Sequence, residues 1–388
     1  MEFELNESQK MLKDTLRKFC DTKVGPAAEE IDRKDEFPEW AWPSLSELGL
    51  MGITIPEEFG GSGSDVLSAA IVMEELSRVC PALSLSWMAH AILCTHNIFV
   101  HANAAQRKKY LPDLCSGKKI GALALTEPGA GSDAVNIQTS AVKKGGKYII
   151  NGTKTFITNG PVADVFVLYA KTAREKKARG ITAFIGEKKF PGFSVSKRLE
   201  KMGHRGSPTG ELVFEDYQVP EENVLTTENL GVSVMMDGLD VERTVIAAGG
   251  VGVGQAALEY SVKYAREREQ FGQPIGKFEF IQGKIADMYA EVEAARLLVH
   301  RAAVQAGKSE RGGKGAEINR MAAAAALFAG EMSERAALNA IQVFGGYGYT
   351  LEYPVNRLLR DAKLYTIGAG TSEVRRIIIA RELLQLKK

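Results

Sequence analysis

The sequence predicts an α+β fold in the order helix, sheet, helix, because the spacing of its apolar residues changes twice along the chain. Up to about residue 116, apolar residues recur every three or four positions, which is typical of amphipathic helices. Short β-branched and aromatic runs follow, and helical spacing returns from about Val232. We therefore expect an all-α N-terminal domain over residues 1–119, a middle antiparallel β-domain over 120–230 and a C-terminal four-helix bundle over 231–388.

The helices of the first domain are predicted from apolar stripes. Leu12, Leu16 and Phe19 lie three or four positions apart and would share one face of a helix. The stretch from Gly60 to Gly63 is rich in glycine and reads as a loop. We therefore expect several helices joined by such loops.

The strands of the middle domain are predicted from short apolar runs and from the turns between them. Asn151-Gly152 and Asn159-Gly160 are strong turn signals, because asparagine and glycine accept the left-handed backbone of a tight turn. The expected strands lie at 147–150, 165–169, 181–185 and 211–214. A small antiparallel sheet accommodates them.

The C-terminal part holds long, alanine-rich segments with helical spacing, at 232–269, 277–306, 314–344 and 373–386. Such segments pack against one another as a bundle. The run Gly249-Gly-Val-Gly-Val-Gly254 lies inside the first of them. It is not a dinucleotide-binding fingerprint, since its spacing differs from Gly-x-Gly-x-x-Gly and no strand precedes it. We interpret it as a site of close helix packing.

Composition argues against several classes of protein. The formal net charge is +1, so no global field attracts nucleic acid or an acidic membrane. The longest apolar runs fall short of the roughly 20 residues that span a bilayer, and we expect no membrane insertion. The four cysteines and five histidines form no metal-binding pattern, and the cysteines are too widely spaced to indicate a disulfide framework.

The first residues, Glu2 to Glu7, lack the basic and apolar regions of a targeting peptide. Unpaired cysteines are typical of a reducing compartment. We expect a cytoplasmic protein, or a protein of the mitochondrial matrix if a transit peptide has been removed.

A glycine-containing segment, Leu123-Ala-Leu-Thr-Glu-Pro-Gly-Ala-Gly-Ser-Asp133, opens the expected β-domain. Its glycines allow the backbone to approach a bulky planar or phosphorylated ligand, and Thr126 and Ser132 add short hydroxyls that suit phosphate or a ring oxygen. The same residue types also form plain surface turns. From these residues alone, both interpretations stay open.

Two further segments also have a functional and an ordinary interpretation. Lys154-Thr-Phe-Ile-Thr-Asn-Gly160 reads equally as a hairpin with a core phenylalanine. Arg266-Glu-Arg-Glu-Gln-Phe-Gly272 reads as the solvated end of a helix, although the planar fork of Arg268 suits a phosphate. Neither segment decides the function by itself.

Two motifs near the C-terminus are more specific. Gln342-Val-Phe-Gly-Gly-Tyr-Gly-Tyr349 is followed by Ile367-Gly-Ala-Gly-Thr-Ser-Glu373. Together with the segments at 123–133, 154–160 and 266–272, these motifs resemble the acyl-CoA dehydrogenase family, and the resemblance covers nearly the whole chain. It implies that family's three-domain fold and a flavin-dependent oxidoreductase that converts an acyl-CoA thioester to its 2-enoyl-CoA.

The resemblance also implies a site for FAD. Phe156 would lie beside the ring system, with Thr158 at the ring edge. Arg268 and Phe271 would hold the pyrophosphate and adenine portion across a subunit boundary. The cofactor-binding residues that it implies are Leu123, Leu125, Thr126, Gly131, Ser132, Phe156, Ile157, Thr158, Arg268, Phe271, Gln342, Gly345, Gly346, Thr371, Ser372 and Glu373. The implied partners are electron-transferring flavoprotein and, as a dimer of dimers, further copies of the chain in a homotetramer.

The position of the catalytic base is the least ordinary feature. Ala369 stands where many members of the family carry their catalytic glutamate. In the isovaleryl-CoA dehydrogenase branch the glutamate of a Leu-Asp-x-Glu-Arg motif takes that role, and Leu239 to Arg243 reproduces this motif. The resemblance implies that Glu242 removes the α-proton while flavin N5 accepts the β-hydrogen as hydride. The N–H of Ala369 remains a donor to the thioester oxygen.

Small residues at 368–370 leave room for branching beside the reacting carbons, so we expect a short branched substrate such as isovaleryl-CoA. The expected substrate-binding residues are Leu93, Ser132, Asp240, Arg243, Tyr365, Gly368, Ala369 and Gly370. Trp87, Met88, Ala91 and Ile92 differ from the residues expected in isovaleryl enzymes. They keep an alicyclic acyl-CoA, such as cyclohexanecarboxyl-CoA, open as the substrate. Ala369 keeps open a protein of another class, a non-catalytic acyl-CoA-binding or assembly protein.

Overall fold

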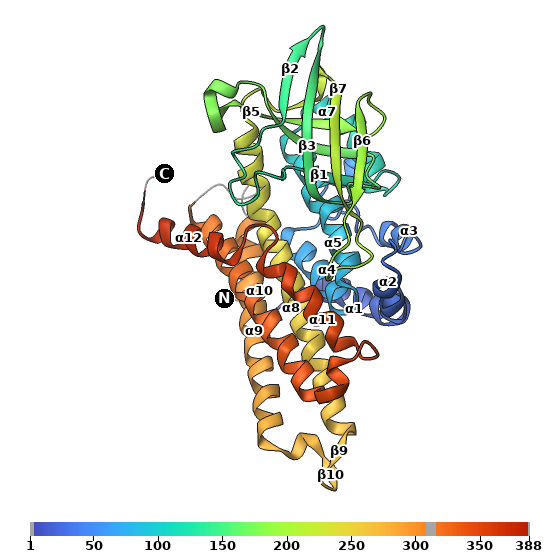
Figure 1. Cartoon of the computed structure of the whole chain (residues 1–388). Coiled ribbons are helices and arrows are strands. Elements are labelled where there is room, and N and C mark those ends of the chain that lie inside the picture. The colour runs from blue at the N-terminus through green and yellow to red at the C-terminus, as the bar shows by residue number, and fades with distance from the viewer. Residues whose placement is uncertain (1–3, 308–315, 387–388) are drawn as a thin grey trace.

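The computed structural model describes residues 4–307 and 316–386. Helices of the N-terminal part lie beside a sheet, and the C-terminal helices form a long bundle that extends away from it (Figure 1). The longest helix, α8 (Gly231–Glu267), runs from the sheet towards the far end of the bundle. The predicted α+β order of helix, sheet and helix is confirmed.

Side-chain caps at Asn6, Asp65 and Asn103 precede three of the N-terminal helices. The N-terminal helices are α1 (Glu7–Phe19), α2 (Ala28–Lys34), α3 (Ala41–Glu47), α4 (Val66–Val79), α5 (Pro81–Met88), α6 (Asn97–His101) and α7 (Ala104–Cys115). Asn6 and Asn103 form capping boxes at the starts of α1 and α7. Every residue of α4 is buried, so α4 forms the centre of this region. Between α5 and α6 the chain takes a π-helical course, η4 (Ala89–His96).

The main sheet is made of β1 (Gly121–Ala124), β2 (Ser140–Lys144), β3 (Lys147–Thr158), β4 (Val165–Lys171), β5 (Ile181–Glu187), β6 (Phe193–Arg198), β7 (Thr209–Pro220) and β8 (Val224–Leu225). The order is β6-β7-β3-β2-β4-β5-β8, with β1 also paired to β4. Every residue of β4 and β5 is buried. The pairing of β3 with β7 is interrupted by an irregularity between Lys154 and Ile157.

The expectation of an antiparallel domain holds for most pairings but needs one correction. Strand β4 pairs in parallel with β1 and, at one position, with β2. Parallel neighbours need a long connection. The chain between β1 and β4 supplies it, because it contains the segment at 125–139 and the β2–β3 hairpin.

The C-terminal bundle contains α8, α9 (Glu279–Gly307), α10 (Ala316–Phe344), α11 (Pro354–Ala362) and α12 (Ser372–Leu383). A two-stranded ribbon, β9 (Glu269–Gln270) and β10 (Gln273–Pro274), follows α8 at the far end. The glycines of α8 permit close approach of its neighbours: a Cβ at Gly250 would meet the carbonyl oxygen of Ala329 at 2.8 Å. The close-packing interpretation of the run at 249–254 is therefore confirmed.

Two helical stretches, Pro81–His101 and Gly231–Glu267, are long and apolar enough to cross a membrane by length and composition, which the shortness of the apolar runs did not anticipate. In each, 78% of the apolar window is buried inside the fold. Such burial is typical of core helices. Within residues 4–307 and 316–386, no group of three histidine, cysteine or acidic side chains is placed to hold a metal ion.

Candidate active site

Glu242 lies in the first third of α8, where the helix passes between the sheet and α12. Its carboxyl is partly buried, and burial raises its pKa to about 7, against the opposing effect of Arg243 and Arg375. Tyr169 on β4 is also buried. Burial is the main cause that raises the pKa of its hydroxyl, and Glu242 raises that pKa further. A carboxyl whose pKa lies near neutrality suits general base chemistry.

The turn between η9 (Lys363–Thr366) and α12 contains Ala369 in a left-handed conformation, with φ of 54°. A non-glycine residue rarely adopts this conformation. Gly370 follows with φ of 93°, and the Thr371 side chain caps α12 by accepting from the N–H of Val374. Gly368 donates its N–H to Leu364, whereas the N–H of Ala369 meets no acceptor among the described residues. The Ala369 N–H is therefore free, as are the N–H groups of Gly370 and Thr371 within the described part of the chain.

Asp240 and Arg243 lie on a different face of α8 from Glu242. They are three residues apart and pair with each other, with Arg243 Nη1 3.3 Å from Asp240 Oδ1. Arg243 also donates to Asn319 on α10 at 3.2 Å. Burial raises the pKa of Asp240 to about 6, although Arg243 draws it down. Both residues are less than 9% exposed, so a ligand would reach only the rim of this pair.

Two of the predicted cofactor segments are tied together. The N–H of Thr155 on β3 donates to the carbonyl of Thr126 at 2.9 Å. The ammonium group of Lys154 donates to the Leu125 carbonyl at 2.9 Å and to Glu127 Oε1 at 2.8 Å. The segment at 123–127 therefore lies against β3, and the two motifs form one surface.

At the irregularity in β3, neighbouring side chains differ in whether they are exposed on this surface or buried. Phe156 has φ of 58° and is 69% exposed, which is unusual for a phenylalanine in a strand. Thr158 is partly buried, and the side chain of Ile157 is buried in the core of the sheet, so only its backbone faces outward. At Gly129 and Gly131 an added Cβ would meet nothing within 4 Å, and Ser132 is exposed. An open, partly aromatic cradle results.

Other predicted cofactor residues do not join this cradle. Arg268, Phe271, Gln342, Gly345 and Gly346 gather at the far end of the bundle, around the β9–β10 ribbon (Figure 1). There Phe271 is 92% exposed, and Arg268 lies over the ring of Tyr347 at 5.4 Å. Within one chain these residues and Glu242 are at opposite ends of α8.

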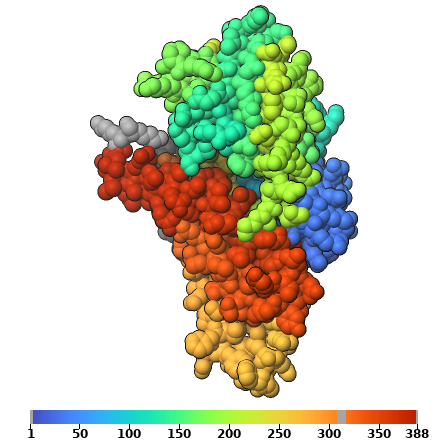
Figure 2. Space-filling model, viewed as in Figure 1, coloured from blue at the N-terminus to red at the C-terminus, as the bar shows by residue number. Residues whose placement is uncertain are grey.

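A hollow of about 450 Å³ lies between α10 and α12. Its lining includes Thr366, Ile367, Thr371, Ser372 and Glu373. The C-terminal residues that form it meet the sheet on the face shown in Figure 2. The last three predicted cofactor residues therefore line a concave surface beside the turn that carries Ala369.

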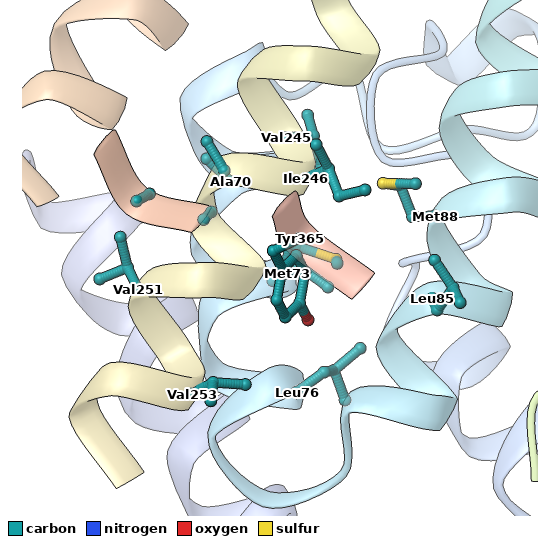
Figure 3. Packing of buried hydrophobic residues seen from close by; sticks show 14 of the residues in the cluster. Ala70, Met73, Leu76, Leu85, Met88, Val245, Ile246, Val251, Val253 and Tyr365 are labelled. Carbon is teal, nitrogen blue, oxygen red and sulfur yellow. The ribbon is translucent and has the colours of Figure 1, made fainter. Parts of the chain in front are cut away.

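The predicted acyl wall is placed in part. Leu93 lies in the π-helical η4, partly buried. Tyr365 is buried between α4 and α8 beside Met73 (Figure 3), and a Cβ at Gly249 would meet both side chains at 2.7 Å. Its hydroxyl lies 3.4 Å from Ser77. The ring of Tyr365 is thus packed into the hydrophobic core that joins α4 and α8.

Trp87, one of the residues that kept an alicyclic substrate open, is fully buried. Its ring N–H donates to the carbonyl of Leu50 at 2.9 Å, which directs it into the core of the N-terminal domain. Met88 lies near Val245 and Ile246 of α8 (Figure 3). Of Trp87, Met88, Ala91 and Ile92, Met88 is the residue that Figure 3 labels beside α8.

The sequence reasoning overlooked Lys154, Glu127 and Arg375 as parts of the site. Lys154 carried a usable signal, since alternation from Tyr148 and Ile150 places it on the buried face of β3. Arg375 carried none, because it stands beside Arg376 in a charged helix and only the fold buries one and exposes the other.

Known proteins share this arrangement. The N-terminal, middle and C-terminal domain models of acyl-CoA dehydrogenases match residues 6–118, 122–217 and 229–384. The mitochondrial isovaleryl-CoA dehydrogenase of Pongo abelii is 49% identical over 381 residues, covering 97% of this chain and 89% of that protein. The mitochondrial 2-methylacyl-CoA dehydrogenase of Solanum tuberosum is 46% identical over 383 residues, covering 98% and 92%.

Among solved structures, a chain described with the electron transferring flavoprotein of Acidaminococcus fermentans is similar over 99% of this chain and all of its own length. The TM-score is 0.96 at 42% identity. The chain belongs to the acyl-CoA dehydrogenase family, a family of flavin-dependent oxidoreductases.

Proposed function

We propose that the chain oxidises a short branched acyl-CoA, with isovaleryl-CoA as the first candidate, to the 2-enoyl-CoA in an FAD-dependent reaction. The observation that carries the proposal is the carboxyl of Glu242, whose pKa of about 7 fits a base. The free N–H of Ala369 supplies the complementary donor. Relatives named as isovaleryl- and 2-methylacyl-CoA dehydrogenases support the choice of substrate class.

Each half of this pair has a separate part in the reaction. Glu242 takes the α-proton, and its loss of hydration on burial makes it a stronger base. The Ala369 N–H donates to the thioester oxygen, where negative charge develops. FAD, when bound, accepts the β-hydrogen as hydride at N5.

The cradle beside β3 fits FAD. Phe156 offers an exposed aromatic face and Thr158 a hydroxyl beside it, while open glycines at 129 and 131 allow backbone to approach. Thr371, Ser372 and Glu373 line the neighbouring hollow. Leu123, Leu125 and Thr126 complete the surface through the bonds that tie them to β3.

The far-end residues fit FAD bound by another copy of the chain. The exposed Phe271 and the guanidinium of Arg268 suit adenine and pyrophosphate, and they lie too far along α8 to reach the cradle of their own chain. We therefore propose a homotetramer built as a dimer of dimers, with electron-transferring flavoprotein as acceptor. The compartment would follow the relatives, mitochondrial or bacterial cytoplasmic.

The substrate would extend from the turn at 368–370 towards the rim of the Asp240–Arg243 pair, with Ser132 beside the pantetheine arm. Leu93 and Tyr365 bound the acyl end. The inward course of Trp87 removes one reason for an alicyclic substrate, and a thioester with a ring remains the competing case to be measured.

Anaerobic titration of the yellow holoprotein tests the proposed substrate. We expect isovaleryl-CoA to bleach the flavin at lower concentration and faster than isobutyryl-, butyryl- or cyclohexanecarboxyl-CoA. Absorbance of the oxidised flavin is the measurement. Comparable bleaching by all four thioesters would overturn the assignment to a branched substrate, and preference for the ring would select the alicyclic alternative.

The pH dependence of kcat/KM follows from Glu242. The charged groups that lower its pKa are Arg243 on α8 and Arg375 on α12, and the neutral Tyr169 lies near it on β4. A base acts only when ionised, so kcat/KM should rise about tenfold per pH unit below the pKa and level off above about 7. Steady-state rates between pH 5 and 8.5 check this, and a flat profile over that range would contradict Glu242 as the base.

A further inference from the structure

A buried guanidinium holds the turn that carries Ala369. Arg375 is fully buried. Its Nη1 donates to the carbonyls of Ala326 and Tyr365 at 3.0 and 2.6 Å, and its Nη2 donates to the carbonyl of Gly368 at 2.7 Å. The two carbonyls of the turn lie on either side of its bend, and the third belongs to α10. One side chain thus fastens the turn to the bundle.

The surrounding helix is shaped for this group. A Cβ at Gly330 of α10 would meet the Tyr365 carbonyl oxygen at 2.6 Å and Arg375 Nη1 at 3.3 Å, so the glycine leaves the room that the guanidinium occupies. Burial and the neighbouring Arg243 lower the pKa of Arg375 to about 10. Arg375 therefore stays charged throughout the working range of pH.

We propose that Arg375 is a positioning residue for the reaction, one that fixes the direction of the Ala369 N–H and sets a positive charge opposite Glu242. The inference rests on the proposed function. The bond to the Gly368 carbonyl orients the Ala369 N–H directly, because both groups belong to one planar peptide unit, and the bond to Tyr365 fixes the chain before the strained left-handed Ala369. The charge favours the ionised carboxylate, which burial alone would suppress.

Substitutions at Arg375 separate the effect of its positive charge from the effect of its planar, multiply donating guanidinium group. Arg375→Lys keeps the charge but cannot bond three carbonyls with the same geometry, whereas Arg375→Gln removes the charge as well. Arg174→Gln is the matched control, since Arg174 also donates to a backbone carbonyl, that of Gln138 at 3.2 Å, but at the surface. All variants are compared as FAD-saturated holoprotein.

The first measurement is the dissociation constant of two ligands. A 2-enoyl-CoA has the thioester carbonyl, and a saturated acyl-CoA thioether lacks it. We expect Arg375→Lys to weaken binding of the enoyl-CoA about tenfold and to leave the thioether within about twofold, because only the carbonyl meets the Ala369 N–H. Equal weakening of both ligands, or of neither, would overturn the positioning role.

The second measurement is the single-turnover rate of flavin reduction at saturating isovaleryl-CoA between pH 6 and 9. We expect Arg375→Lys to be slower by about tenfold with the midpoint of the wild type, and Arg375→Gln to shift the midpoint upward by at least about half a pH unit. An unshifted midpoint in Arg375→Gln would refute the electrostatic part. Should that variant fail to fold, a wild-type rate in Arg375→Lys would still refute the proposal.

Failure of the inference and failure of the proposed function have different signatures. A wild type that no acyl-CoA bleaches would remove the proposed function, whereas rapid bleaching by Glu242→Gln would remove only Glu242 as the base. A dead Glu242→Gln alongside Arg375 variants that match Arg174→Gln would remove only the inference.

Discussion

Replacing Glu242 with glutamine is expected to slow flavin reduction by acyl-CoA by about 10³-fold or more, because the amide cannot accept the α-proton. General base groups typically contribute 10² to 10⁴-fold, and here no other carboxyl lies in the turn at 368–371. Stopped-flow absorbance of the oxidised flavin under anaerobic conditions measures the loss. The flavin should remain bound, since Glu242 lies outside the cofactor cradle.

A carboxylate elsewhere on the same helix provides the control. Glu259 on α8 pairs with Arg17 and Arg78 and has no part in the proposed site. Glu259→Gln should reduce the flavin at the wild-type rate. Rapid bleaching by Glu242→Gln would instead show that the base is elsewhere, and an inactive wild type would favour the non-catalytic acyl-CoA-binding alternative.

Although Glu242→Gln should slow the reaction, it should stabilise the folded chain at high pH. Because the pKa of Glu242 is higher in the folded chain than in the unfolded one, its contribution to stability is present below the unfolded pKa and is lost as pH rises towards about 7. Glutamine does not ionise, so Glu242→Gln does not lose stability in this way as pH rises. Its Tm should therefore exceed that of the wild type at pH 8 and approach it near pH 5.

Replacing Glu127 with glutamine is expected to lower the free energy of unfolding by about 3–5 kcal/mol, because it leaves the buried Lys154 uncompensated. Burial lowers the pKa of Lys154 to about 8, and Glu127 opposes that effect. The carboxylate also accepts from the N–H of Thr139 at 3.0 Å and from its hydroxyl. These donors all meet Oε1, so an amide oxygen there could retain them, but the NH₂ group would then face the N–H of Gln138, which donates to Oε2.

An exposed pair across the same sheet supplies the matched control. Lys143 and Glu221 form an ion pair in which both side chains are about half exposed. Glu221→Gln should cost about 0–1 kcal/mol. Urea unfolding of both variants at one FAD concentration measures the difference. Equal losses would contradict a structural role for the Glu127–Lys154 pair.

Local sequence patterns were sufficient to predict the helices and strands and to propose candidate site residues. The spacing of apolar residues predicts helix, sheet and helix, and the motif around Glu242 follows from its resemblance to one branch of a family. The alternation along β3 also points to Lys154 as an inward residue. The order of the elements is confirmed because it depends on neighbours within a few residues, whereas the role of Glu242 stays a prediction.

Local sequence patterns did not predict the contacts between segments that are far apart in the sequence. The parallel pairing of β1 with β4 joins segments about forty residues apart, and nothing in either strand indicates its direction. Arg375 and Arg376 are adjacent and chemically identical, yet only Arg375 is buried against carbonyls from α10 and from the turn. Nothing in the sequence indicates that the ring N–H of Trp87 donates to the carbonyl of Leu50.

The sequence by itself determined the order of elements, the fold class and the replacement of the usual glutamate by Ala369. Only the tertiary structure decided that Glu242 has a pKa near 7, that the Ala369 N–H is free and that Arg375 donates to the Gly368 carbonyl. Burial and electrostatic potential are sums over neighbours brought together from α8, α10, α12 and β4. No single segment contains those sums, so they exist only once the chain is folded.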